Sequence, residues 1–255
     1  HPGEYNYLAR WIDKKVILRA TKIVFATDAM RDLYCRQYPS LSLEKTVVIE
    51  NGFNEEILSQ SSFTKESVSP TDTLLLLHSG AIYPNGRDPR PLLTALGKLK
   101  QQKPNVAGRI RLRFRAAECI PEYRRVIDTY DIAELVEFCP SVSYVESIEE
   151  MHSADVLLLM QGQVFNYQIP GKAYEYIASN KPILCLAHNL GATVHLLQSV
   201  EGAVVSDEMD AESIIIALEE LLTLSSNPKP IERVVETHSR FTKAKQLAAL
   251  LDEIL

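Results

Sequence analysis

The chain has 255 residues, a formal net charge of -6 and 46% hydrophobic residues. This length is enough for one large or two small folded domains, and the composition is that of an ordinary globular protein. The acidic balance argues against nucleic acid as the main partner, because phosphate backbones are held by surplus Lys and Arg. The apolar runs are far too short to cross a bilayer.

The cysteines are scattered and form no C-x-x-C pair. They are Cys35, Cys119, Cys139 and Cys185. This usage predicts a reduced, cytoplasmic setting, and the histidines show no zinc-ligand spacing, so no structural metal is expected. Because the sequence begins at His1 rather than Met, we expect that the true N-terminus lies upstream.

The first part of the chain alternates between helical and strand-like patterns. The predicted elements are a helix at 5–20 with a broad apolar face, a strand at 22–27, a helix at 28–38 and a strand at 46–49. The segment 59–72 is polar, rich in Ser and without period, which predicts a linker between two lobes.

After this linker the alternation is more regular. Strands are predicted at 74–77, 109–115, 136–138, 156–160, 182–186 and 203–205, and helices at 91–101, 121–130, 148–151, 194–199, 211–223 and 240–254. Continuous apolar strands that alternate with helices indicate an α/β fold, a Rossmann-like doubly wound parallel sheet covered on both faces. Ligands of such sheets bind beyond the carboxyl ends of the strands. The Gly80 turn, the turn at 140–142 and the loop at 161–171 should therefore line one crevice.

The segment 169–186 predicts a loop, a short helix and a buried strand. Pro170 suits the first helical position, and Asn180 followed by Pro182 predicts the end of the helix. The amides of Gly171 and Lys172 would then point out of a helix N-terminus, where the helix dipole and the Lys charge both favour an anion such as phosphate.

Glu175 lies one helical turn after Lys172, on the same face. A carboxylate just behind a phosphate site can accept hydrogen bonds from both hydroxyls of a ribose, so the arrangement predicts a site for a nucleotide diphosphate. The competing interpretation is that Lys172 and Glu175 form a surface ion pair, which contributes only a few tenths of a kcal/mol.

The run from Lys172 to Ile183 has the pattern K-x-x-E-Y-x-A-x-x-x-P-I. It resembles the donor-site helix of retaining GT-B glycosyltransferases, in particular family 4, and the resemblance extends along nearly the whole chain. It implies that Glu175 binds the ribose of a nucleotide-sugar. Many family members carry a second Glu upstream, on the transferred sugar, where this chain has Tyr167. Backbone groups between Gln168 and Gly171 are expected to recognise the sugar instead.

The turn after the strand at 74–77 supplies Gly80, Arg87 and Arg90. Glycine lets the backbone approach a ligand closely, and the Arg fork fits phosphate oxygens. Family members similarly place an Arg or Lys near this turn on the diphosphate, whose negative charge grows as the glycosidic bond breaks. Lys172 is the other candidate for this charge, and pairing of Arg87 with Asp88 is the competing interpretation.

These observations predict three segments. Residues 1–57 would be the tail of an N-terminal acceptor domain, 58–236 a C-terminal nucleotide-sugar donor domain, and 237–255 a C-terminal helix that packs back toward the N-terminal lobe. By resemblance, the whole enzyme would transfer a sugar from a nucleotide-sugar to a glycan or lipid-linked acceptor, with retention, without a metal or other cofactor, and in the cytoplasm or at the inner face of the membrane.

No catalytic residue is identified, so little or no transfer is expected from this chain alone. Two other functions stay open. One is another GT-B activity, such as a nucleotide-sugar 2-epimerase, and the other is a non-catalytic nucleotide-sugar-binding module, which Tyr167 in place of Glu would suit.

Overall fold

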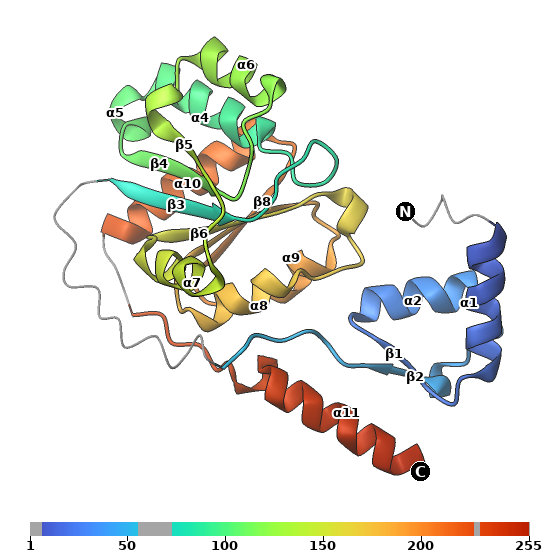
Figure 1. Cartoon of the computed structure of the whole chain (residues 1–255). Helices are drawn as coiled ribbons and strands as arrows, with labels where there is room; N and C mark the ends of the chain where they lie inside the picture. The colour runs from blue at the N-terminus through green and yellow to red at the C-terminus, as the bar shows by residue number, and fades with distance from the viewer. Residues whose placement is uncertain (1–6, 56–72, 227–229, 255) are drawn as a thin grey trace.

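The computed structural model describes residues 7–55, 73–226 and 230–254 (Figure 1). Its central feature is a six-stranded parallel sheet with the order β5-β4-β3-β6-β7-β8. The strands are β3 (Leu74–Ser79), β4 (Ile110–Arg115), β5 (Val136–Cys139), β6 (Val156–Gln161), β7 (Ile183–Ala187) and β8 (Ala203–Asp207). The predicted α/β, doubly wound sheet is confirmed. The strand order reverses between β3 and β6, which is the point where such sheets bind ligands.

Helices cover both faces of this sheet, as Figure 1 shows. One face carries α4 (Arg90–Gln102), α6 (Pro121–Tyr130) and α10 (Ala211–Ser226), with α5 (Pro104–Ala107) beside α4; the other carries α7 (Tyr144–Ser153), α8 (Gly171–Ala178) and α9 (Ala192–Leu197). The turns η3 (Ala133–Leu135), η4 (Gln163–Phe165) and η5 (Glu236–His238) lie in the connections.

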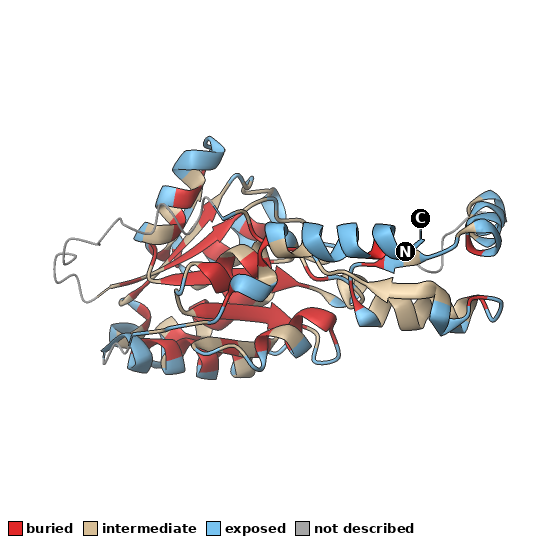
Figure 2. Cartoon of the chain, turned by 90° about the horizontal axis from the view of Figure 1, so that it is seen from below, coloured by how far each residue is buried: buried red, intermediate tan, exposed pale blue. Residues whose placement is uncertain are grey.

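A hydrophobic core lies on each face of the sheet, where the strands pack against the helices, because successive residues of a strand point to opposite faces. Leu76 of β3 packs in the core with α4, α6 and α10, whereas Leu77 packs in the core with α7, α8 and α9. Both side chains are fully buried, and Figure 2 shows the buried strands between exposed helix surfaces. This burial on both faces explains why the strands read as continuous apolar runs.

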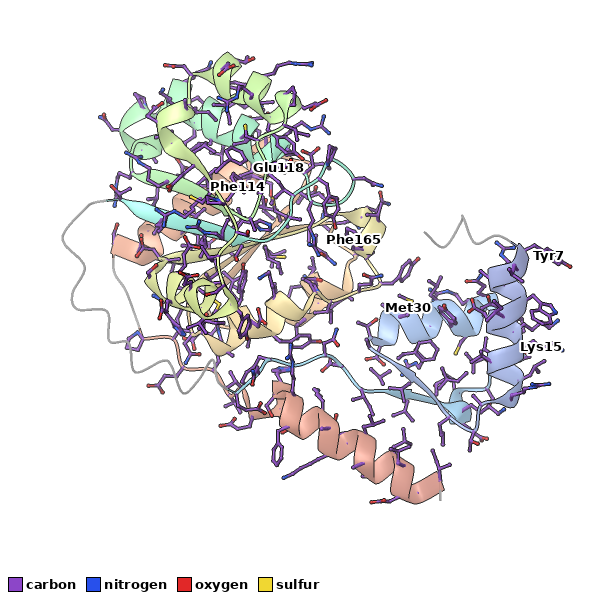
Figure 3. The ribbon with its side chains drawn as sticks, viewed as in Figure 1. Tyr7, Lys15, Met30, Phe114, Glu118 and Phe165 are labelled. Carbon is purple, nitrogen blue, oxygen red and sulfur yellow. The ribbon has the colours of Figure 1, made fainter. Side chains whose placement is uncertain are left out.

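A smaller part precedes the sheet. It contains α1 (Tyr7–Arg19), β1 (Ile23–Phe25), α2 (Asp28–Gln37), η1 (Leu43–Lys45) and β2 (Thr46–Val48), and β1 pairs with β2 in parallel. The helix predicted at 5–20 forms, but its apolar face is not packed: Tyr7 is 90% exposed and Trp11 54%. Figure 3 shows Tyr7 and Lys15 projecting from the outer side of α1. The predicted linker at 59–72 lies outside the described residues.

The last helix, α11 (Arg240–Ile254), begins beside the connection that leaves β2. Phe53 forms an isolated parallel bridge with Ser239. Arg240 Nε donates to the carbonyl of Gly52 at 3.1 Å, and Lys243 pairs with Glu50 at 3.1 Å. These contacts join the start of α11 to residues 50–53. The three domain limits given above stay predictions.

The helix predicted at 148–151 is in fact α7, which is ten residues long. It begins early because Ser143 and Glu146 form a capping box: the Ser143 hydroxyl accepts from the Glu146 amide, and the Glu146 carboxylate accepts from the Ser143 amide. Two amides at the helix start are satisfied in this way. The S-x-x-E signature was present in the sequence and would have given the correct start.

Candidate functional site

Two loops meet at the reversal point of the sheet, one after β3 and one after β6. The first contains a hairpin in which Tyr83 and Arg87 exchange backbone hydrogen bonds of 3.0 and 3.2 Å. Gly86 closes it with φ +104°, a conformation that favours glycine. The Gly162 amide donates to the Gly86 carbonyl at 2.7 Å. A Cβ on Gly162 would lie 2.8 Å from the Gly86 Cα, so glycine at both positions allows this close approach.

The N-terminus of α8 lies beside the β3 turn. Pro170 is the cap residue with an extended backbone, and the helix starts at Gly171, so the prediction of Pro170 in the first helical position is wrong by one residue. Asn180 ends the segment with φ 54°, as predicted. A Cβ on Gly80 would lie 3.4 Å from the Cε of Lys172. The turn and the helix tip named from the sequence are therefore in contact.

Arg87 and Lys172 place their charges at the carboxyl end of β3. The pKa of His78, near the end of that strand, is lowered to about 4, mainly by burial, and the charges of Arg87 and Lys172 contribute to this lowering. The Arg87 guanidinium lies 5.6 Å from the Tyr83 ring centre and 5.8 Å from that of Phe165. Cation–π contacts of this kind hold a guanidinium in place without neutralising it.

Glu175 lies on the same helix and is half-buried, outside the core. Burial raises the pKa of the neighbouring Tyr176 hydroxyl, and the charges of Glu175 and Arg87 act on that hydroxyl in opposite directions. Within the described part of the chain, Lys172 and Glu175 form no ion pair with each other, and Arg87 forms none with Asp88. The two competing interpretations given above are thus not what the structure contains.

Arg90 is held differently. Its guanidinium pairs with Asp88, with Nη2 2.5 Å from Oδ2 and Nε 2.7 Å from the same oxygen. It also begins α4, so its fork is engaged within its own turn. A role for Arg90 on a diphosphate stays a prediction, and of the two arginines Arg87 has the guanidinium that no carboxylate of the described residues pairs with.

Sequence reasoning missed the residues that support Arg87. Tyr83 and Phe165 meet edge to face with ring centres 6.3 Å apart, and they come from the two different loops. His78 was also missed, although a histidine at the end of an apolar strand was a visible signal. Its Nδ1 lies 3.0 Å from the Leu158 carbonyl. Since a carbonyl only accepts, Nδ1 carries the proton.

The β6 loop also contacts the N-terminal part of the chain. Thr27 caps α2 by accepting from the Met30 amide, and its hydroxyl donates to the Tyr167 carbonyl at 2.6 Å. Figure 3 shows Phe165, on this loop, facing the part of the chain that carries Met30. The Tyr167 backbone thus joins the two parts beside the site.

The chain superposes on solved glycosyltransferases. A glycosyltransferase from Rickettsia africae matches with a TM-score of 0.73, 15% identity and coverage of 98% of this chain and 68% of that one. HepE from Anabaena, in complex with UDP and glucose, matches with a TM-score of 0.72, 13% identity and coverage of 99% of this chain and 68% of that one. Sucrose-phosphate synthase from Thermosynechococcus elongatus matches with a TM-score of 0.66, 15% identity and coverage of 100% of this chain and 63% of that one. The fold is GT-B. At these identities the likeness concerns the fold, and the chain spans about two thirds of each structure.

No protein-family model and no curated protein sequence matches the chain significantly. In GT-B terms, the sheet of residues 74–207 is one Rossmann-like domain. Over residues 7–55, 73–226 and 230–254, no group of three or more His, Cys, Asp or Glu is placed to hold a metal ion. No helix in the same ranges is long and apolar enough to cross a membrane.

The contact between the two loops gives a testable prediction. In Gly162→Ala the new Cβ would press on the Gly86 backbone, so the turn that carries Arg87 must move. We expect nucleoside diphosphate affinity, measured by calorimetry with UDP, to fall about tenfold, since sub-ångström misplacement of a binding group has effects of this size. Gly108→Ala, at the end of α5 with φ -60°, is the control. Equal affinities for both variants would show that this contact does not position Arg87.

Proposed function

We propose that this chain is the donor-binding part of a glycosyltransferase, which transfers a sugar from a nucleotide-sugar to a glycan or lipid-linked acceptor. The observation that supports this most directly is the convergence of one carboxylate and two cations, neither of which pairs with a carboxylate of the described residues, at the reversal point of a GT-B sheet. Arg87, Lys172 and Glu175 come from two segments far apart in the sequence. The charges of Arg87 and Lys172 both act on buried His78. Those of Arg87 and Glu175 both act on buried Tyr176.

Each group has a distinct part in the proposed site. The amides of Gly171 and Lys172 open the N-terminus of α8, where aligned peptide dipoles favour an anion. Arg87 and Lys172 supply fixed positive charge for the diphosphate. As the glycosidic bond breaks, the nucleoside diphosphate gains negative charge, so groups already oriented toward it stabilise the transition state more than the ground state.

Glu175 lies one helical turn after Lys172, on the same face of α8. Its carboxylate would accept hydrogen bonds from the ribose hydroxyls and orient the leaving nucleotide. We further propose that transfer proceeds with retention at the anomeric carbon and without a metal, with the cations in the charge-stabilising role. A family 4-like enzyme with this arrangement could work at the inner face of a membrane.

We propose that the groups that activate the acceptor belong to the acceptor domain, of which residues 1–57 would be the tail. This chain is therefore expected to bind nucleotide and to show little or no transfer. Release of free nucleotide from a nucleotide-sugar only on addition of acceptor, with the preceding part restored, would identify a transferase. Release without acceptor would instead fit an epimerase or a hydrolytic side reaction.

The ribose contact is tested with Glu175→Ala. A charged hydrogen bond contributes about 1.5–3 kcal/mol, so we expect UDP affinity to fall by about tenfold to a hundredfold. Inorganic pyrophosphate has no ribose, and its affinity should not fall. Glu175→Gln keeps the shape and one acceptor oxygen and should give an intermediate loss. An unchanged UDP affinity in calorimetry would remove Glu175 from the site, and with it the proposed ribose contact.

A further inference from the structure

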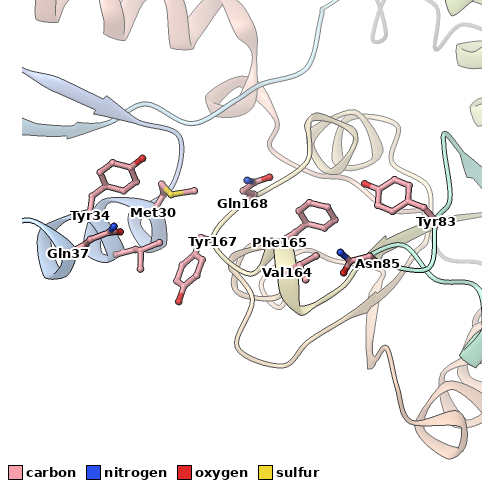
Figure 4. A pocket seen from close by; sticks show the side chains of 10 residues that line it. Met30, Tyr34, Gln37, Tyr83, Asn85, Val164, Phe165, Tyr167 and Gln168 are labelled. Atoms are coloured by element: carbon pink, nitrogen blue, oxygen red, sulfur yellow. The ribbon is translucent and has the colours of Figure 1, made fainter. Parts of the chain in front are cut away.

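A second hollow lies beside the donor site, between α2 and the loops after β3 and β6. Its volume is about 370 Å³, which is in the range of small-molecule pockets. Figure 4 shows side chains of both parts of the chain around it. The residues that line it include no Asp, Glu, Lys, Arg or His. The hollow is therefore uncharged, in contrast to the neighbouring cluster of Arg87, Lys172 and Glu175.

Four aromatic rings line this hollow. They are Tyr34 on α2, Tyr83 on the β3 turn, and Phe165 and Tyr167 on the β6 loop. No helical spacing in the sequence connects them, and only the fold brings them together. Flat rings offer large contact area at a small entropy cost, and each Tyr adds a hydroxyl. Such rings suit the apolar C–H face of a sugar ring.

Three carboxamides accompany the rings: Gln37 on α2, Asn85 on the β3 turn and Gln168 on the β6 loop. None of their side-chain amides has a hydrogen-bond partner among the described residues. A carboxamide both donates and accepts, as a sugar hydroxyl does. An isoprenoid chain would suit the rings but would leave these amides without water, which costs free energy.

We propose that this hollow binds a neutral saccharide, the acceptor glycan of the transfer reaction. Only the role of this saccharide as the acceptor rests on the proposed function. Saccharide binding itself follows from aromatic rings and carboxamides around an uncharged cavity. The volume admits one or two sugar units. A glycan with uronic acid or phosphate at this position would meet no countercharge in the lining.

The hollow and the donor site share residues. Tyr83 and Phe165 line the hollow and also contact the Arg87 guanidinium. A saccharide on these rings would restrict the turn that carries Arg87, and so reduce the ordering that a diphosphate must impose. Coupling between two binding sites is reciprocal. UDP should therefore bind more tightly in the presence of the saccharide, and the saccharide more tightly in the presence of UDP.

The test uses the 255-residue chain and saturation-transfer NMR. The probes are maltose, lactose, sucrose and chitobiose, with geraniol as the apolar comparison. We expect at least one disaccharide to bind, alone and with saturating UDP-glucose. Gln37→Ala and Tyr167→Ala should each weaken that binding about tenfold, the effect of one lost ring contact or hydrogen bond. Tyr7→Ala, which removes a ring that is 90% exposed on α1, is the matched control.

Three results would overturn the inference. They are the absence of binding by every neutral disaccharide while UDP binds, binding of geraniol in their place, and displacement of the disaccharide by UDP-glucose, which would make the hollow the donor-sugar site. Calorimetry with UDP on Gln37→Ala should give the affinity of the unmodified chain. If the unmodified chain fails to bind UDP, the proposed function fails, and the disaccharide signals still decide this inference.

Discussion

The double variant Arg87→Ala, Lys172→Ala is expected to bind UDP about a thousandfold more weakly than the unmodified chain. Both cations act on His78 and stand at the carboxyl end of β3, where neither has a carboxylate partner among the described residues. A charged hydrogen bond contributes about 1.5–3 kcal/mol, and two of them lost together correspond to about three orders of magnitude in affinity.

Calorimetry at constant ionic strength measures this loss, because exposed charges are screened by salt. The matched control is Lys98→Ala, Lys103→Ala. It removes the same number of charges, from the face where Lys98 and Lys103 pair with Glu212 and Glu219. Both double variants take the net charge from -6 to about -8 by removal of two positive side chains. Similar losses in the two would mean that overall charge, and not a local site, attracts the nucleotide.

Most of the sheet could be predicted from sequence because its strands are buried on both faces. Leu74–Ser79 and Val156–Gln161 are runs of apolar residues too short for helices and bounded by turns. The reversal of strand order between them follows from the pairing of β3 with both β4 and β6. The alternation of strands and helices in the sequence indicates a parallel sheet, but it does not predict the order of the strands in that sheet.

The helix tip of the site could be predicted because its signals are local. Gly171, Lys172 and Glu175 stand within one and a half turns of α8, and Asn180 marks its end. The sequence predicted that the Gly80 turn and the loop before α8 line one crevice, but it did not predict the contact of Gly80 with Lys172. This contact depends on the carboxyl ends of neighbouring strands lying at one edge of the sheet.

The aromatic support of Arg87 could not be predicted. Tyr83 and Phe165 stand on different loops, and they meet because Gly86 and Gly162 allow those loops to touch. Glycine in a loop indicates freedom of the backbone but does not name the partner. The exposure of Trp11 on α1 could not be predicted either, because periodicity identifies an apolar face but does not show what covers it.

His78 gives the second large effect, which concerns stability. The ring is 3% exposed, and its pKa is lowered to about 4, first by burial and then by the charges of Arg87 and Lys172. In the unfolded chain the ordinary His pKa is about 6.5. Between these two values the unfolded state binds the proton and the folded state does not. Stability from the neutral ring is therefore complete above about pH 6.5 and is lost as pH falls toward 4.

The size of this loss follows from the difference between the two pKa values, at about 1.4 kcal/mol per unit, which gives on the order of 3 kcal/mol. His78→Gln keeps a donor for the Leu158 carbonyl and cannot take up a proton. Urea unfolding at several pH values between 4 and 7 measures the free energy of unfolding. As pH falls, this free energy should decrease less for His78→Gln than for the unmodified chain. His195→Gln, at an exposed position of α9, should decline like the unmodified chain. Parallel profiles for all three would mean that the pKa of His78 is not lowered in the folded chain, and that burial of the ring does not disfavour its protonation.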